Sequence, residues 1–138
     1  MPARGYYEFD GMAPSGEGRA TFRIAKEGIL EHFRKTGDSA RLLEGLLVPA
    51  VVDSPAAVFQ GLKREGQDDV LVYAGVPSDR YIRNHNIRVP CPPGKTFLLF
   101  VTPDFKVVKW RWEEADPERP GFPIDYDTRF GRRLWPQD

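Results

Sequence analysis

The chain has 138 residues, a length typical of one domain, and its 41% hydrophobic and 29% charged residues exclude a disordered polymer. It contains no run of about 18 apolar residues, so the sequence offers no transmembrane helix. The lone cysteine, Cys91, excludes an internal disulfide framework. We expect it to be a small apolar filler; the alternative is a nucleophile. With only two histidines, a structural zinc site is not expected either.

The formal net charge is zero, but the charges are unevenly placed along the chain. Residues 79–112 carry a net charge of +5, from seven Lys/Arg and two Asp. Residues 113–138 carry −3, from seven acids and four arginines. A local basic region of this kind can bind phosphate groups. The alternative is that the acidic tail folds over the basic region and neutralises it.

The N-terminal residues 1–18 carry four glycines and two prolines, which predicts a loosely ordered arm. This segment is polar and lacks the apolar stretch of a secretory signal, so we expect a cytoplasmic protein that does not associate with membranes. The following stretch, RATFRIA, predicts a short strand or the entry to a helix.

Residues 25–53 are predicted to be helical. In KEGILEHFRKTGD, apolar residues four apart share one helix face, and Gly37 is expected to end the helix. A second helix is expected to begin at Asp38 or Ser39, because either residue is a favoured N-cap. Pro49 lacks a backbone N–H and therefore predicts a break or a restart.

Residues 56–113 are predicted to form an antiparallel sheet of about four strands. The runs AAVFQGLKR and DVLVYAGVP, separated by the polar EGQDD, predict one hairpin. The runs TFLLFV and KVVKWRWEE predict a second, because Pro103 and Asp104 between them favour a tight turn.

The strands of the second hairpin differ in their patterns. Residues 97–101 are apolar on both faces and predict a central strand. The partner strand alternates, so its two faces are predicted separately. Val108, Trp110 and Trp112 are expected to face the core, and Lys109, Arg111 and Glu113 the opposite side.

Residues 114–138 contain four prolines and several acids, which predicts an irregular tail. Its large apolar side chains are expected to dock on the domain: Phe122, Tyr126, Phe130, Leu134 and Trp135. The fold expected from the sequence is therefore a single α+β domain. Its N-terminal helices would pack on an antiparallel sheet of about four strands, with the irregular C-terminal tail docked against it.

Several strong chemical signatures are absent from the sequence, including a P-loop, a G-x-G-x-x-G fingerprint, a G-x-S-x-G elbow and paired metal ligands. No cofactor and no metal is therefore expected. Two histidines and several arginines would suffice for metal-free RNA cleavage, which needs a base, an acid and a cation beside the phosphate. Arg111, on a strand between two tryptophans, offers the most rigid guanidinium. The plainer alternatives are a structural or exposed His32, and a His85 that belongs to an Asn-rich turn.

The order of these elements resembles the barnase/EndoU/colicin/RelE-like class of metal-independent nucleases, and in particular its phage-associated branch. The resemblance covers about residues 25–113 and rests on ILEHFRKTGD, DSPAAVF, VFQGLK, VLVYAG and FLLFVTPDFKVVKWRW. It implies RNA on an open sheet face, with His32 matching the helix histidine and Arg111 and Lys109 matching strand-borne basic residues. The second histidine that often follows on that helix is missing, because Thr36 and Gly37 follow Lys35.

The first hypothesis is a small nuclease-like protein, a metal-independent RNase or toxin-type effector. Its expected catalytic residues are His32, His85 and Arg111. Phosphate would be bound by Arg80, Arg83, Arg88 and Lys109, with the loop YIRNHNIRVP overhanging the basic face. The alternative is a non-catalytic module that binds RNA or a protein partner, such as an inhibitor. An enzyme acting on a small molecule in a pocket under the tail is a third hypothesis.

Overall fold

The computed structural model describes residues 5–26, 44–61 and 70–137. The first half of this part of the chain forms β1 (Tyr6–Met12), β2 (Arg19–Ala25), the 3-10 turn η2 (Gly45–Leu47), α3 (Val48–Asp53), β3 (Ala57–Gln60) and β4 (Leu71–Gly75). The second half forms α4 (Asp79–Asn84), β5 (Lys95–Val101), β6 (Lys106–Asp116), β7 (Arg119–Pro123), α5 (Tyr126–Arg129) and β8 (Arg133–Trp135). Strands therefore dominate, and the three α-helices of the described residues are short.

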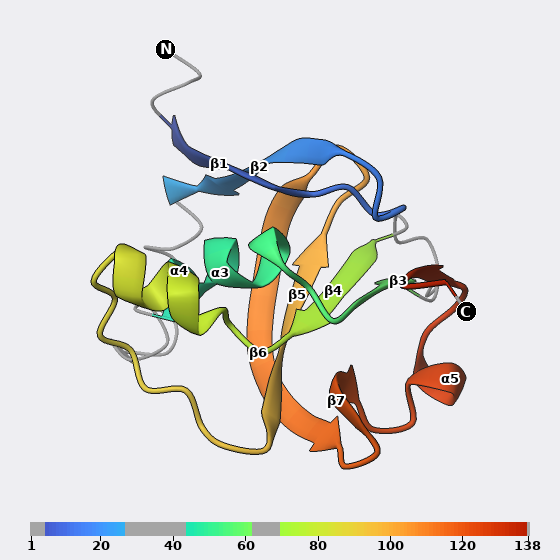
Figure 1. Cartoon of the computed structure of the whole chain (residues 1–138). Coiled ribbons are helices and arrows are strands. Elements are labelled where there is room, and N and C mark those ends of the chain that lie inside the picture. Colours follow the sequence, from blue (N-terminus) through green and yellow to red (C-terminus); the bar gives the residue numbers. More distant parts are fainter. Residues whose placement is uncertain (1–4, 27–43, 62–69, 138) are drawn as a thin grey trace.

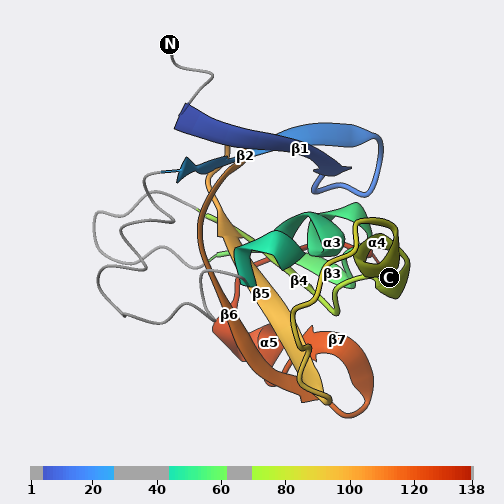
Figure 2. The ribbon, with the colours of Figure 1, turned by 90° about the vertical axis from the view of Figure 1, so that its left-hand side faces the viewer.

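In the described part of the chain, eight strands form one curled sheet (Figure 1). Its hydrogen-bonded order is β1-β2-β6-β5-β4-β3-β8, and β7 pairs with the end of β6. The sheet is mixed, because β2 and β6 run parallel whereas the other neighbours run antiparallel. The curl brings the β1–β2 hairpin to one side of α3 and β4 to the other (Figure 2).

The short helix α3 fills the concave side of the sheet. Val48, Ala50, Val51 and Val52 are fully buried, as is Leu47 just before them. Only Asp53, at the end of the helix, is charged, and it pairs with Arg19 at the surface. The apolar residues before it can be buried on every side because strands surround them. This helix and the strand residues around it form the first hydrophobic core.

Two contacts hold β1 against α3 and β4. A Cβ atom at Gly11 would lie 2.6 Å from Val52 Cγ2, so only glycine fits there. The hydroxyl of the buried Tyr73 donates a hydrogen bond to the Met12 carbonyl oxygen at 2.9 Å. Phe9 also stacks on Phe22, with ring centroids 5.9 Å apart. The N-terminal hairpin is therefore held by contacts with distant segments.

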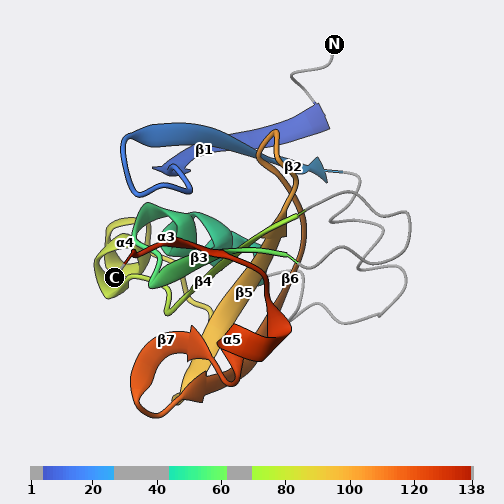
Figure 3. The same cartoon turned by 90° about the vertical axis from the view of Figure 1, so that its right-hand side faces the viewer.

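A second core lies on the opposite face of the sheet, under the C-terminal segment (Figure 3). Phe59 stacks against Phe130 at 5.2 Å between ring centroids and also contacts the rings of Phe122 and Tyr126. Leu134 and Trp135 pack instead against the first core. The predicted docking of the tail aromatics is confirmed, but the prediction of an irregular tail over 114–138 is wrong, because β7, α5 and β8 form there.

The expected α+β fold, with helices packed on an antiparallel sheet of about four strands, is wrong. Residues 1–18, predicted to be a loosely ordered arm, contain β1, the RATFRIA stretch forms β2, and the tail contributes β7 and β8. With the four expected strands, the sheet of the described residues therefore has eight. The helices predicted over 25–53 fall mostly on residues 27–43, outside the described part. Within that part, α3 restarts with Pro49 in its first turn, as the sequence predicts.

Both predicted hairpins are confirmed. The strands β3 and β4 pair antiparallel, and so do β5 and β6, with a Phe105 N–H to Thr102 O bond of 2.9 Å closing the turn. One face assignment on β6 is wrong, however. The register shifts between Phe100 and Val101, so Val107 takes the core position and Val108 becomes the extra residue of a bulge, half exposed.

The loop YIRNHNIRVP does not overhang the cationic face of β6. Its first part belongs to α4, whose N-cap Ser78 accepts a hydrogen bond from the Tyr81 N–H at 3.3 Å. Ile82, Ile87 and Val89 pack against the first core, on the side of the sheet that α3 covers. These three apolar residues therefore hold the stretch on the sheet face opposite Lys109 and Arg111.

The bulge generates a prediction about two adjacent valines. Val107→Ala should lower the free energy of unfolding by about 1–3 kcal/mol, because it removes methyl groups from the first core. Val108→Ala should change it by no more than about 0.5 kcal/mol, because that side chain is half exposed. Urea unfolding of both variants measures the difference. A larger effect at Val108 than at Val107 would contradict the register.

Candidate functional site

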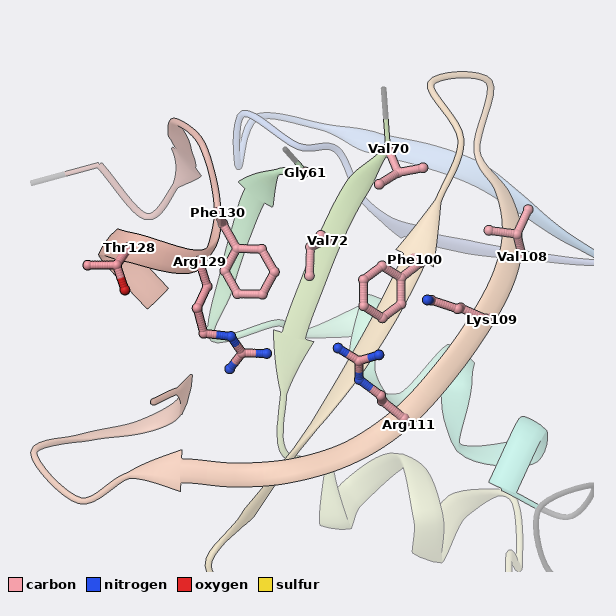
Figure 4. A pocket seen from close by; sticks show the side chains of 10 residues that line it. All are labelled: Gly61, Val70, Val72, Phe100, Val108, Lys109, Arg111, Thr128, Arg129 and Phe130. Atoms are coloured by element: carbon pink, nitrogen blue, oxygen red, sulfur yellow. The ribbon is translucent and has the colours of Figure 1, made fainter. Parts of the chain in front are cut away.

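A groove of about 590 Å³ lies on the sheet face opposite α3, between the middle strands and the C-terminal segment (Figure 4). Its lining comes from β4, β5, β6 and α5, from residues next to these elements, and from the residue after β3. These are Gly61, Val70, Val72, Phe100, Val108, Lys109, Arg111, Thr128, Arg129 and Phe130. The groove therefore combines apolar and cationic side chains.

The floor of the groove is apolar and partly aromatic. Val72 on β4 and Phe100 on β5 belong to the second core or pack against it. Phe130, just after α5, covers Phe59 with one side of its ring. Figure 4 shows the rings of Phe100 and Phe130 on either side of Val72. This floor can accept a flat apolar group.

Lys109 and Arg111 reach the groove because they are two residues apart on β6. They lie opposite Phe100 and Leu98 in the β5–β6 register. The Lys109 ammonium is 4.5 Å from the centroid of the Phe100 ring, and the Arg111 guanidinium carbon is 5.0 Å from it. Both cations are thus stacked on one aromatic ring, which holds them at the groove.

A single carboxylate joins the cations of two elements. Glu113 Oε2 accepts a hydrogen bond from Arg111 Nε at 2.6 Å, and its Oε1 lies 2.6 Å from a terminal nitrogen of Arg129. The Glu113 side chain is 18% exposed, compared with 46% for Arg111 and 34% for Arg129. Because Glu113 is the most buried of the three, it fixes the two guanidinium groups in position.

Arg129 was not predicted as a site residue. It lies at the end of α5, where it donates a hydrogen bond to the Ile124 carbonyl oxygen at 3.1 Å. The sequence feature that could have identified Arg129 is its neighbour Phe130, because the docking of Phe130 on the domain was predicted. An aromatic residue docked on the open sheet face carries the adjacent arginine to that face.

The predicted catalytic residues are not all on this face. Arg111 lies at the groove, whereas His85 caps the end of α4, which packs against the first core on the other side of the sheet. The His85 ring stacks on Tyr81, with 3.8 Å between centroids, and its Nδ1 is 3.0 Å from the Tyr81 carbonyl oxygen. His32 lies outside the described residues. The structure therefore does not bring His85 and Arg111 together.

The predicted phosphate-binding residues separate in the same way. Lys109 lines the groove with Arg111, but Arg80 and Arg83 are exposed on α4 and Arg88 follows it. Trp110, between the two groove cations in sequence, packs on the first core and approaches Gly45. The sheet thus lies between the cations of α4 and those of β6.

The remaining candidate groups lie away from the groove. Cys91 is exposed, so the prediction of an apolar filler is wrong. Partial burial of its thiol, together with the nearby Asp79 carboxylate, raises its pKa and weakens it as a nucleophile at neutral pH. Within the described residues, no group of three or more His, Cys, Asp or Glu could hold a metal ion. No helix in that part of the chain is long and apolar enough to cross a membrane.

Comparison of the chain with models of known families, with curated proteins and with solved structures finds no match. The resemblance to metal-independent nucleases stays a prediction.

Proposed function

We propose that this protein is a binding module for single-stranded RNA and that the groove is its binding surface. The observation that carries this proposal is the convergence of Lys109, Arg111 and Arg129 around an apolar floor with two aromatic rings. Proteins that bind single strands combine cations along the phosphate backbone with aromatic side chains on which bases stack. The groove offers both kinds of contact within one surface.

The geometry supports binding better than catalysis. General acid–base cleavage needs proton donors and acceptors within about 2.6–3.2 Å of the reacting atoms. The residues that line the groove in the described part of the chain include no histidine and no carboxylate. The adjacent carboxylate, Glu113, is paired with two arginines, and His85 lies across the sheet. These placements favour the non-catalytic alternative raised by the sequence.

A salt titration tests the proposal with matched arginine variants. One ionic contact for each of the three groove cations gives a slope of about −2 for log affinity against log salt, at about 0.7 per contact on a single strand. Arg111→Gln and Arg129→Gln should each weaken binding and reduce the slope by about 0.7. Arg83→Gln on α4 is the control and should leave both the affinity and the salt slope unchanged. Fluorescence anisotropy of a labelled RNA measures affinity, and thermal melts check that each variant folds.

Two results would contradict the groove as the RNA-binding surface. Equal effects of Arg83→Gln and Arg111→Gln would restore the single basic surface expected from the sequence. No salt-dependent RNA binding at low ionic strength would favour a protein partner.

Incubation of the protein with RNA in EDTA separates the binding module from the nuclease hypothesis. We expect the RNA to remain intact, because the described residues of the groove bring no acid–base pair to a phosphate. A metal-independent RNase would instead leave a 2′,3′-cyclic phosphate with a bell-shaped pH dependence. It would also lose about 10²–10⁴ in rate on His32→Ala or His85→Ala. Cleavage that those variants lose would contradict a purely binding function.

A further inference from the structure

The charge of the groove matches one particular phosphate group. Lys109, Arg111 and Arg129 contribute three positive charges and Glu113 one negative charge, which leaves +2. An internal phosphodiester carries one negative charge. A phosphate monoester carries about −1.5 to −2 at pH 7, because its second pKa is about 6, and it presents three strong acceptor oxygens. Three cations around one monoester can therefore each take an oxygen.

Shared contacts join the three cations in a row: Glu113 binds both arginines, and the Phe100 ring lies under both Arg111 and Lys109. The two oxygens of Glu113 bind one arginine each, so the two guanidinium groups are neighbours although they come from β6 and α5. Figure 4 shows both guanidinium groups pointing toward the centre of the groove, with the Lys109 ammonium on the same side. The bond to Glu113 uses the Nε–H of Arg111, and a guanidinium carries further N–H donors at its terminal nitrogens.

The size of the groove limits how much of a strand it holds. Its volume of about 590 Å³ falls in the range of about 300–1,000 Å³ typical of sites for single small ligands. Open surfaces for single strands cover about 4–16 nucleotides per OB fold. The groove is therefore on the scale of one nucleotide, with the base on the Phe130 ring and the phosphate among the cations, two of which already cover the Phe100 ring.

We propose that the groove binds the phosphorylated end of an RNA strand, with Lys109, Arg111 and Arg129 around the terminal monoester. This inference rests on the proposed RNA-binding function and names the part of the RNA that is recognised. Glu113 acts as a positioning residue, since it touches the arginines and holds them for the phosphate. Both a 5′- and a 3′-monoester have the required chemistry.

The experiment compares three labelled RNAs of one sequence, about eight nucleotides long. One carries a 5′-phosphate, one a 3′-phosphate, and one has hydroxyl groups at both ends. Anisotropy should show that one phosphorylated RNA binds about tenfold or more tightly than the hydroxyl RNA, since charge-assisted hydrogen bonds are added. The preference should shrink between about pH 7.5 and about pH 5.5, because protonation removes one phosphate charge below a pKa of about 6.

Variants connect the preference to the groove. Arg129→Gln should abolish the preference for the phosphorylated end, and Arg83→Gln on α4 should preserve it. Glu113→Gln should also reduce the preference, because the arginines lose their common anchor while the net positive charge rises. A stronger preference in Glu113→Gln would overturn the positioning role. Thermal melts identify any variant that fails to fold, and Arg111→Lys then provides a second, charge-preserving change that should also weaken the preference.

The outcomes separate this inference from the proposed function. Equal affinity for all three RNAs would overturn recognition of the end while leaving RNA binding intact. Absence of binding to every RNA would overturn both. A phosphoserine peptide that binds as tightly as the phosphorylated RNA would overturn the assignment to RNA and leave a general phosphate-monoester site.

Discussion

Burial of β5 on both faces is the constraint on which the rest of this fold depends. Residues 96–99 are fully buried, so each side of the strand needs its own cover. One face of β5 is covered by α3 and the N-terminal hairpin. The other face is covered by the aromatic residues that follow β6. Because β5 is apolar on both faces, segments from both ends of the chain pack against it. This explains why the sheet of the described residues has eight strands and two separate cores. The chain contacts that achieve this are mostly between segments far apart in sequence.

The candidate site arises where this cover is incomplete. The C-terminal segment packs over β3, β4 and the end of β6, and it leaves the second face open along Phe100, Lys109 and Arg111. The bulge at Val108 restores the alternation of β6 so that both tryptophans face the first core and both cations face the groove. Glu113 then ties β6 to α5 through two arginines. The ion pairs of Glu113 therefore both hold α5 against β6 and place Arg111 and Arg129 side by side at the groove.

Local patterns predicted the parts of the structure that depend on neighbouring residues. The TPDF turn, the two hairpins and the two-sided apolar strand could be read from residue order, as could the outward placement of Lys109 and Arg111. The parts that depend on distant contacts could not. The glycine-rich start of the chain becomes β1 because Gly11 fits against Val52 and the Tyr73 hydroxyl donates a hydrogen bond to the Met12 carbonyl oxygen. Arg129 joins the site through Glu113, and the separation of His85 from Arg111 follows from which face α4 covers. None of these pairings leaves a periodic signal in the sequence.

The most direct test of the account is to map the RNA-binding surface by nuclear magnetic resonance. A proton–nitrogen correlation spectrum that includes arginine side chains would be followed while a phosphorylated RNA is added. If the groove binds RNA, the largest shifts will occur at Arg111 Nε, Arg129 Nε and the backbone of residues 109–113 and 128–130, and the α4 arginines will be unaffected. Shifts concentrated on Arg80, Arg83 and His85, with the groove unchanged, would contradict it and move the binding surface to the opposite face of the sheet.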